Sequence, residues 1–273
     1  MGKFDKILIC TDLDGTLLRN DKTISERNLD AIEYFKSEGG LFTFITGRMP
    51  YYVKHIYDIV KPNAPIGCVN GGGIYDYTTE KYLWTITLDR AVLELVEYAD
   101  RAFDDIGIQV CTFENTYFSK QNGLMEKFRA ITGLPNLERH YNDVCEPIGK
   151  IIFGDDNEET LNRLKEHLDA HPSAIQFDFI RSERSLYEIL PKGVNKGNLI
   201  IKLAELLGID CIRTIGMGDY DNDIELVKSA GLGVAVSNAK DEVKAVADYI
   251  TVSNEEDAIA TIIDDIDSGK III

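Results

Sequence analysis

Short apolar runs alternate with helical patterns in the first part of the chain. Residues 6–11, 41–45 and 66–69 are mainly apolar and are bounded by polar residues, Pro or Gly, which is typical of buried strands. Between them, residues 25–39 and 50–60 place apolar side chains three or four positions apart, as one face of a helix requires. Continuous apolar strands linked by helices predict an α/β fold with a parallel sheet covered on both faces.

The periodicity changes in the middle of the chain. Residues 74–86 are typical of a hairpin that turns at residues 78–80. From residue 88 to residue 189 the apolar runs come partly in pairs, with helical stretches between them. This mixed pattern favours a separate α+β domain, which we place at residues 85–190.

The strand–helix order of the first segment returns after Pro191. Its predicted elements are a helix at residues 196–207, a strand at 212–215, a helix at 221–229 and a strand at 232–236. We therefore expect one Rossmann-like core domain formed by residues 1–84 and 191–273, into which the α+β domain is inserted.

The charge of the chain restricts its partners. Acidic residues number 46 against 29 Lys and Arg, which gives a formal charge of −17. Such a surface repels phosphate backbones, so we expect no nucleic-acid partner. A small phosphorylated metabolite is compatible with this charge, because a pocket around a metal ion can be locally positive.

Nothing in the sequence predicts a membrane or secretory protein. The longest apolar runs are shorter than the 18 residues expected of a spanning helix, and the apolar run near the N-terminus is too short for a signal peptide. The chain has 5 cysteines without a C-x-x-C pair. We expect reduced thiols and a cytoplasmic protein that is a monomer or a small homo-oligomer.

The first predicted strand ends in two carboxylates. Asp12 and Asp14 are two positions apart, so on an extended segment they point the same way, and Gly15 allows a sharp turn directly afterwards. In open α/β sheets, ligands bind at the carboxyl ends of the strands. Alone, however, this pair is as typical of a turn as of a site.

A second acidic group follows the strand predicted at residues 212–215. Residues 216–223 contain three aspartates, at positions 219, 221 and 223, so two strand ends carry five between them. Two carboxylates about 4 Å apart repel by roughly 4 kcal/mol at an effective dielectric of about 20. A tight acidic cluster therefore indicates a bound cation, and oxygen ligands alone favour Mg²⁺.

Two other motifs at this position are excluded by residues that do not match them. An EF-hand loop beginning at Asp219 would require Gly and Glu where the chain has Ile224 and Ala230. A dinucleotide fingerprint beginning at Gly216 would require Gly where the chain has Asp221.

Two weaker signals concern phosphate. The second predicted strand ends in Thr46-Gly47-Arg48, which offers a hydroxyl and backbone N–H groups to an oxyanion. Lys196 lies where the chain re-enters the core domain and begins a helix, a position that the helix dipole disfavours for a cation. Each is individually more typical of an ordinary strand end or surface lysine.

Together, these motifs resemble those of the haloacid dehalogenase superfamily. The matching residues are Asp12-Leu13-Asp14-Gly15-Thr16, Thr46, Lys196 and Gly218-Asp219-x-x-Asn222-Asp223. The insertion between Thr46 and Lys196 looks like the C2B-type cap of that superfamily. Asn70-Gly71 and the segment 188–197 resemble its Cof-like phosphatase branch.

The resemblance implies a Mg²⁺-dependent phosphatase. Asp12 would attack phosphorus and form an aspartyl-phosphate, and Asp14 would protonate the leaving alkoxide and then deprotonate the hydrolytic water. Mg²⁺ would be held by Asp12, the backbone carbonyl of Asp14 and Asp219, with Asp223 holding its water molecules.

The resemblance also implies the phosphate-binding residues. Thr46 and Lys196 would balance charge on the transferred group, with the backbone of Gly47 beside them, and Asn222 would help to position it. We expect small phosphorylated metabolites as substrates, sugar phosphates first, with specificity set by the inserted domain. Two alternatives stay open, namely a phosphomutase of the same superfamily and a phosphate sensor without turnover.

Overall fold

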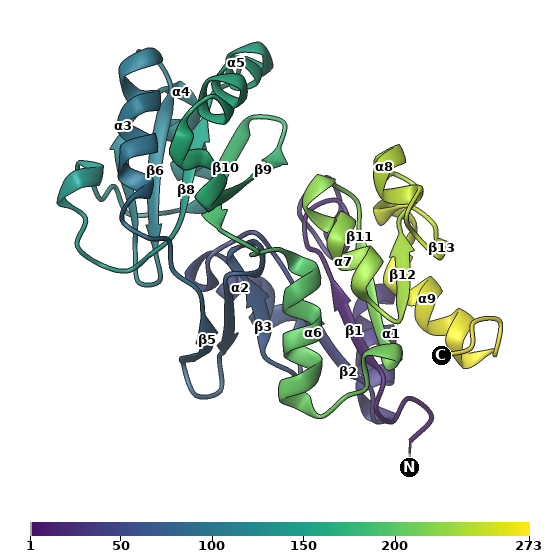
Figure 1. Cartoon of the computed structure of the whole chain (residues 1–273). Coiled ribbons are helices and arrows are strands. Elements are labelled where there is room, and N and C mark those ends of the chain that lie inside the picture. The colour runs from purple at the N-terminus through teal and green to yellow at the C-terminus, as the bar shows by residue number, and fades with distance from the viewer. Residues whose placement is uncertain (1) are drawn as a thin grey trace. The chain divides into compact units, whose positions relative to one another are not determined.

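The computed structural model describes residues 2–273 and divides the chain into two compact units, shown in Figure 1. The first unit comprises the residues up to Trp84 together with Asn195–Ile273, and the second comprises Thr85–Val194. The second boundary falls after the expected residue 190, because the last strand of the second unit runs to Pro191 and Val194 N–H donates to the Pro191 carbonyl.

Five parallel strands form the central sheet of the first unit. They are β1 (Leu8–Thr11), β2 (Leu41–Phe44), β11 (Thr214–Gly218), β12 (Leu232–Ala235) and β13 (Tyr249–Ile250). Their order is β13-β12-β11-β1-β2, so β1 pairs with β2 on one side and with β11 on the other. The strand order changes direction beside β1, which makes this edge a topological switch point.

Two helices of the first unit begin directly after a residue whose side chain caps them. The helices are α1 (Glu26–Ser37), α2 (Pro50–Val60), α6 (Lys196–Leu207), α7 (Ile224–Ser229), α8 (Asp241–Lys244) and α9 (Ala258–Asp267). Ser25 caps α1 and Asn195 caps α6, each accepting a backbone N–H of the first turn. Leu199 and Leu203 of α6 and Leu226 of α7 pack with Leu8 and Cys10 of β1.

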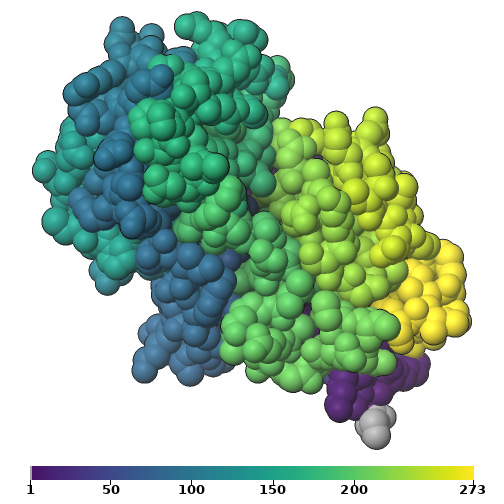
Figure 2. Space-filling model, viewed as in Figure 1, coloured from purple at the N-terminus to yellow at the C-terminus, as the bar shows by residue number. Residues whose placement is uncertain are grey.

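The two ends of the chain meet in the first unit. The Lys3 ammonium forms an ion pair with Asp267 of α9, and the backbone N–H of Ala260 donates to the buried side chain of Asn28 in α1. In Figure 2 the purple N-terminal segment lies beside the yellow C-terminal segment. These contacts fix the C-terminal helix α9 to the N-terminal part of the first unit.

Two elements near the second acidic group begin later than predicted. Residues Cys211–Arg213 form a 3₁₀ turn because the Asp210 carboxylate accepts the N–H of Ile212, so β11 begins at Thr214. Residues Asp221–Asp223 form a second 3₁₀ turn, and α7 begins only at Ile224.

The third predicted strand does not pair along its length with the parallel sheet. β3 (Ile66–Cys68) pairs antiparallel with β4 (Gly73–Asp76), which is followed by β5 (Lys81–Thr85) in a three-stranded sheet. A single parallel bridge from Ile45 to Gly67 connects β3 to the end of β2. The strand ends before Val69, whose φ of 57° turns the chain.

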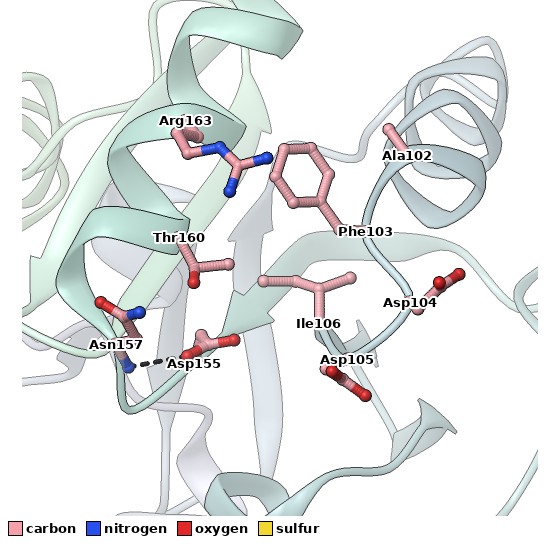
Figure 3. Close-up of a pocket in the computed structure, with 9 residues that line it drawn as sticks. All are labelled: Ala102, Phe103, Asp104, Asp105, Ile106, Asp155, Asn157, Thr160 and Arg163. Carbon is pink, nitrogen blue, oxygen red and sulfur yellow. Dashed lines mark hydrogen bonds between the residues drawn. The ribbon is translucent and has the colours of Figure 1, made fainter.

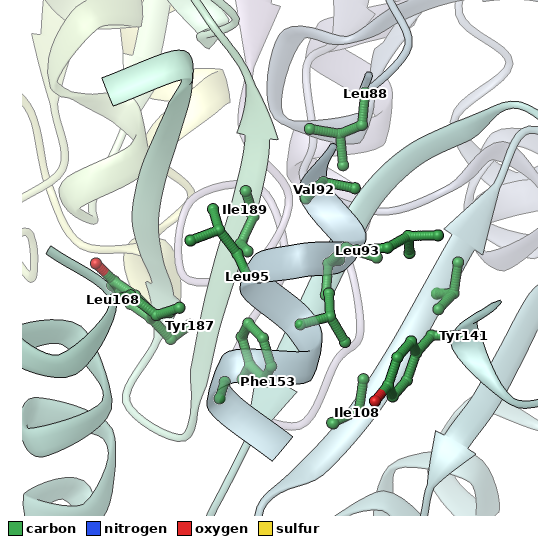
Figure 4. Packing of buried hydrophobic residues seen from close by; sticks show 14 of the residues in the cluster. Leu88, Val92, Leu93, Leu95, Ile108, Tyr141, Phe153, Leu168, Tyr187 and Ile189 are labelled. Carbon is green, nitrogen blue, oxygen red and sulfur yellow. The ribbon is translucent and has the colours of Figure 1, made fainter. Parts of the chain in front are cut away.

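The second unit is an antiparallel sheet with helices. Its strands are β6 (Gly107–Thr112), β7 (Thr116–Lys120), β8 (Ile148–Gly154), β9 (Phe177–Glu183) and β10 (Leu186–Pro191), in the order β7-β6-β8-β10-β9. Its helices are α3 (Val92–Ala102), α4 (Gly123–Thr132) and α5 (Glu158–Asp169). Figure 4 shows its core, in which Ile108, Phe153 and Ile189 of the sheet pack with Leu95 of α3 and Leu168 of α5.

The two units confirm the predicted fold class, a parallel α/β core with an α+β insertion. Among residues 2–273, no helix is long and apolar enough to cross a membrane.

Candidate active site

The ends of three neighbouring strands bring the predicted residues to one edge of the core sheet. Thr11, the last residue of β1, is level with Phe44 of β2 and Met217 of β11. The backbone N–H of Asp12 donates to the Met217 carbonyl over 2.8 Å, and Ile45 N–H donates to the Thr11 carbonyl over 2.9 Å. The segments that begin at Asp12, Thr46 and Asp219 therefore start from adjacent points.

Lys196 is fully buried between two carboxylates. Its Nζ donates to Asp12 Oδ1 at 2.7 Å and to Asp223 Oδ1 at 2.6 Å. Burial by itself lowers the pKa of an ammonium, but the two carboxylates outweigh it and raise the pKa of Lys196. Lys196 is thus a fixed positive charge beside Asp12, and these carboxylates offset its unfavourable place at the start of α6.

Asp12 lies in a strongly negative and nearly closed environment. Burial raises the pKa of its carboxyl group, Lys196 opposes that rise, and the charges of Asp223, Asp219 and Asp14 add to it. Its Oδ1 accepts from Lys196, whereas Oδ2 takes no hydrogen bond from any of residues 2–273. A bound cation would relieve the repulsion among these carboxylates.

Asp223 connects Lys196 to the loop after β11. One of its oxygens accepts from Lys196, and the other accepts from the backbone N–H groups of Asp219 and Tyr220 at 3.0 and 3.1 Å. The side chain has no solvent exposure. Asp223 therefore positions both the Lys196 ammonium and the backbone of the loop after β11.

Asp219 contacts the turn that follows Asp14. Its Oδ1 accepts from the Thr16 hydroxyl at 2.9 Å. Gly15 has a φ of 81°, and a Cβ there would lie 2.4 Å from Asp219 Oδ2, so this position requires glycine for its backbone conformation and for the close approach. Burial and the charge of Asp223 raise the pKa of Asp219 to about 7.

The acidic residues have the chemistry of a divalent metal site. Asp12, Asp219 and Asp223 each offer a carboxylate oxygen, and these atoms lie within 4.8 Å of one another. The donors are all oxygen, which suits Mg²⁺. Burial first, and then the charges of the neighbouring carboxylates, raise the pKa values of Asp12 and Asp219.

Asp14 binds different partners from Asp12. Arg48 donates to both oxygens of Asp14, through Nε at 2.9 Å and Nη2 at 2.8 Å, and Lys22 Nζ donates to Oδ1 at 2.8 Å. Burial raises the pKa of the Asp14 carboxyl group, but these two cations outweigh it and hold the pKa below its ordinary value. The sequence left the partner of Arg48 open and gave no sign of Lys22.

The loop after β2 carries Thr46, whose side chain accepts a hydrogen bond from the backbone of the same loop. Thr46 is 2% exposed, and its hydroxyl oxygen accepts the N–H of Arg48 at 3.2 Å. The hydroxyl hydrogen stays available to an anion at this edge of the sheet. A Cβ on Gly47 would lie 2.7 Å from Asn70 Oδ1, so only glycine allows this loop to approach Asn70 so closely.

Asn70 contacts Asn222, the predicted phosphate-positioning residue. Asn222 Nδ2 donates to Asn70 Oδ1 at 3.0 Å, and both side chains are buried. In the sequence, Asn70 was notable only as part of a family pattern. Its role as a contact of Asn222 depends on a turn after β3 that no local pattern predicts.

The second unit contains a cavity of about 490 Å³ between the end of α3 and the start of α5 (Figure 3). Three of its lining residues are carboxylates, Asp104, Asp105 and Asp155, and Arg163 lies over the Phe103 ring. The Asp155 carboxylate accepts the backbone N–H of Asn157 at 2.7 Å. An acidic lining of this kind does not favour a phosphate group.

Several polar residues of the second unit have partners within it. Arg181 donates to Asn162, Arg184 pairs with Glu158, and Arg129 lies over the ring of Phe118. The hydroxyl of Tyr117 donates to Glu146.

Comparisons with known proteins decide the family. The family model of the haloacid dehalogenase-like hydrolases matches residues 9–263. The chain belongs to this family. The match covers both segments of the core and the whole insertion, and it agrees with the resemblance to Cof-like members of the superfamily.

Similar proteins of this hydrolase family are named as phosphatases. The chain is 30% identical over 259 residues to the 5-amino-6-(5-phospho-D-ribitylamino)uracil phosphatase YitU of Bacillus subtilis, covering 93% of this chain and 94% of that protein. It is 29% identical to YwtE, which has the same activity name and comes from the same organism, covering 96% and 98%. The predicted class, a phosphoric monoester hydrolase of this superfamily, is thereby confirmed.

A solved structure agrees over nearly the whole chain. A haloacid dehalogenase-like hydrolase from Bacteroides thetaiotaomicron has a TM-score of 0.84 with 26% identity, covering 95% of this chain and 99% of that one. The similarity therefore includes the inserted unit as well as the core.

Proposed function

We propose that this hydrolase is a Mg²⁺-dependent phosphatase of small phosphorylated metabolites that forms an aspartyl-phosphate on Asp12. The observation that carries the proposal is the contact of Lys196 with both Asp12 and Asp223. It fixes one oxygen of a buried carboxylate at a strand end and leaves the other available for attack.

In the first step, an Asp12 oxygen forms a bond to phosphorus while the bond from phosphorus to the ester oxygen breaks. Arg48 and Lys22 hold the pKa of Asp14 low in the free site, so Asp14 would take up a proton when the phosphate dianion binds beside it and then give that proton to the leaving alkoxide. In the second step, Asp14 takes a proton from water as the water oxygen attacks phosphorus, and Asp12 leaves as a carboxylate. Thr46, the backbone of Gly47, Lys196 and Asn222 would bind the phosphoryl oxygens during both steps.

The charges of the site support a requirement for a divalent cation. Asp12, Asp14, Asp219 and Asp223 exceed the positive charge of Lys196, Arg48 and Lys22, so a phosphate dianion would enter a negative site. Bound Mg²⁺ would offset this charge. Asp12, Asp219 and the backbone carbonyl of Asp14 would hold the ion, and Asp223 would hold its water molecules. A proton on Asp14 would complete the balance.

The relatives narrow the proposed substrate class. YitU and YwtE are named for a substrate that carries its phosphate on a ribityl chain. This supports phosphates of sugars and sugar-like polyols as substrates of this chain, with the second unit as the domain that selects among them. Pyridoxal phosphate and nucleotides are the next classes to compare.

Hydrolysis of p-nitrophenyl phosphate by the purified protein tests the reaction, and a panel of phosphorylated metabolites compared by kcat/KM tests the substrate. We expect turnover with Mg²⁺ and none in EDTA; turnover without metal would contradict the mechanism. Phosphate transfer between positions of a sugar that depends on glucose 1,6-bisphosphate would identify a phosphomutase instead.

A further inference from the structure

The turn after β3 has an unusual backbone. Val69, Asn70 and Gly71 have φ values of 57°, 51° and 109° in succession. Positive φ is rare for a β-branched residue such as Val69, and such conformations persist only where surrounding contacts impose them. Val69 is also completely buried, so the turn is held within the core of the first unit.

The turn is bound to the predicted phosphate loop through the backbone. Val69 N–H donates to the Arg48 carbonyl and Asn70 N–H donates to the Thr46 carbonyl, both at 3.1 Å. Thr46 N–H in turn donates to the Gly67 carbonyl at 3.0 Å. The conformation of the turn therefore sets the position of the Thr46 loop.

The same turn contacts the two other segments that carry phosphate-side residues. The Asn70 carboxamide accepts from Asn222 Nδ2 at 3.0 Å. A Cβ on Gly71 would lie 2.2 Å from the carbonyl oxygen of Asn195, the residue that caps α6 and precedes Lys196. One three-residue turn thus lies against the Thr46 loop, the Asn222 loop and the start of α6.

The hydrogen bond from Asn222 also determines which end of its amide is presented. An amide nitrogen has two hydrogens, and one of them is used by Asn70. Without this acceptor, the Asn222 amide is free to rotate and to present its carbonyl oxygen, which a phosphate dianion repels. With it, the second N–H remains as a fixed donor.

We propose that Asn70 is a positioning residue for phosphoryl transfer, which orients the Asn222 amide so that an N–H group meets the phosphoryl oxygens. The inference rests on the proposed function, because it assigns Asn222 to the phosphate. Asn70 acts through Asn222 and does not itself touch the reacting atoms.

The test is a double-mutant cycle of Asn70→Gly and Asn222→Ala. Glycine removes the side chain of Asn70 and keeps its left-handed backbone conformation. Two quantities are measured, kcat/KM for p-nitrophenyl phosphate and the Kd of orthovanadate in the presence of Mg²⁺. We expect each single variant to weaken both by about 10- to 100-fold, the double variant to be no worse than Asn222→Ala, and the affinity for Mg²⁺ to be unchanged.

Asn28→Ala is the matched control, because Asn28 is a buried asparagine that binds the backbone of α9. It is expected to lower thermal stability and to leave kcat/KM and the vanadate Kd unchanged. Independent, additive effects of Asn70→Gly and Asn222→Ala would overturn the proposal. So would wild-type behaviour of Asn70→Gly, or an equal kinetic loss in Asn28→Ala.

If Asn70→Gly does not fold, Asn70→Asp replaces it, since Asp also tolerates this backbone conformation and keeps an acceptor oxygen. Asn222→Ala should then still weaken vanadate binding in the Asn70→Asp background, and no further weakening would overturn the proposal. Vanadate binding without turnover in the wild type would contradict the proposed function alone. Absence of vanadate binding to the wild type with Mg²⁺ would overturn the positioning role.

Discussion

Arg48 binds both carboxylate oxygens of Asp14, at 2.9 and 2.8 Å, in the first unit. The pair connects the loop after β2 to the strand end that carries Asp12. It fixes the side chain proposed as acid and base, because a planar guanidinium with two hydrogen bonds defines the orientation of a carboxylate. Lys22, the second partner, is 60% exposed and makes a single hydrogen bond.

The first prediction concerns this pair. Arg48→Gln is expected to lower kcat/KM by about 10- to 100-fold, because a misplaced catalytic group loses the advantage of orientation. Arg48→Lys should recover only part of the loss, since an ammonium cannot form the two-bond contact.

Lys22→Gln is the matched control for Arg48→Gln. It should change kcat/KM by no more than about twofold, because exposed ion pairs contribute little. Steady-state kinetics with p-nitrophenyl phosphate measures all three variants. Equal losses in Lys22→Gln and Arg48→Gln would show that the oriented contact has no special role.

A second prediction follows from the raised pKa of Asp219. An unfolded Asp titrates near pH 4, whereas burial and Asp223 raise the pKa of Asp219 in the folded protein to about 7. Between these values the folded state holds a proton that the unfolded state has lost, so stability contributed by this group falls as pH rises and is fully lost above about pH 7. Mg²⁺ would bind the ionised form and offset the loss.

We therefore expect Mg²⁺ to raise Tm more at about pH 8 than at about pH 5, by on the order of a few degrees. Asp219→Asn should raise Tm in EDTA at the higher pH and remove most of the response to Mg²⁺. Thermal unfolding of both proteins at the two pH values measures this. A Mg²⁺ response that Asp219→Asn leaves intact would place the metal elsewhere.

The third prediction concerns the burial of Lys196. Lys196→Met leaves Asp12 and Asp223 buried without their cation, which is expected to lower the free energy of unfolding by about 3–5 kcal/mol at neutral pH in EDTA. Lys202→Met on the same helix is the control, because Lys202 is one third exposed and pairs with the exposed Glu205, so a change within about 0.5 kcal/mol is expected. Chemical denaturation compares them, and similar losses would contradict the account of Lys196.

Much of the core could be predicted because its signals are local. The strands predicted at residues 6–11 and 41–45 end directly before Asp12 and Thr46, and the strand predicted at 212–215 ends four residues before Asp219. Parallel strands place such ends at one edge of the sheet. Helix α6 begins at Lys196, as the prediction of a helix at residues 196–207 has it. The second unit was recognised as α+β from its paired strands, although β8 was not predicted as a separate element.

What the sequence could not predict depends on contacts between distant segments. Valine is atypical at positive φ, so nothing in the run 66–69 indicated that β3 ends before Val69. The choice of Asp14 as the partner of Arg48 requires the folded positions of two loops. The contact between Asn70 and Asn222 joins residues 152 positions apart and depends on that same turn.

The central claim is that Asp12 is phosphorylated during turnover. The most direct measurement is mass spectrometry of the peptide that contains Asp12, after acid quench of the enzyme within a single turnover with Mg²⁺ and substrate. The account predicts a phosphoryl group on Asp12 that forms and decays with the reaction, and neither phosphorylation nor turnover in Asp12→Asn. Release of phosphate without phosphorylated Asp12, or continued turnover by Asp12→Asn, would contradict it.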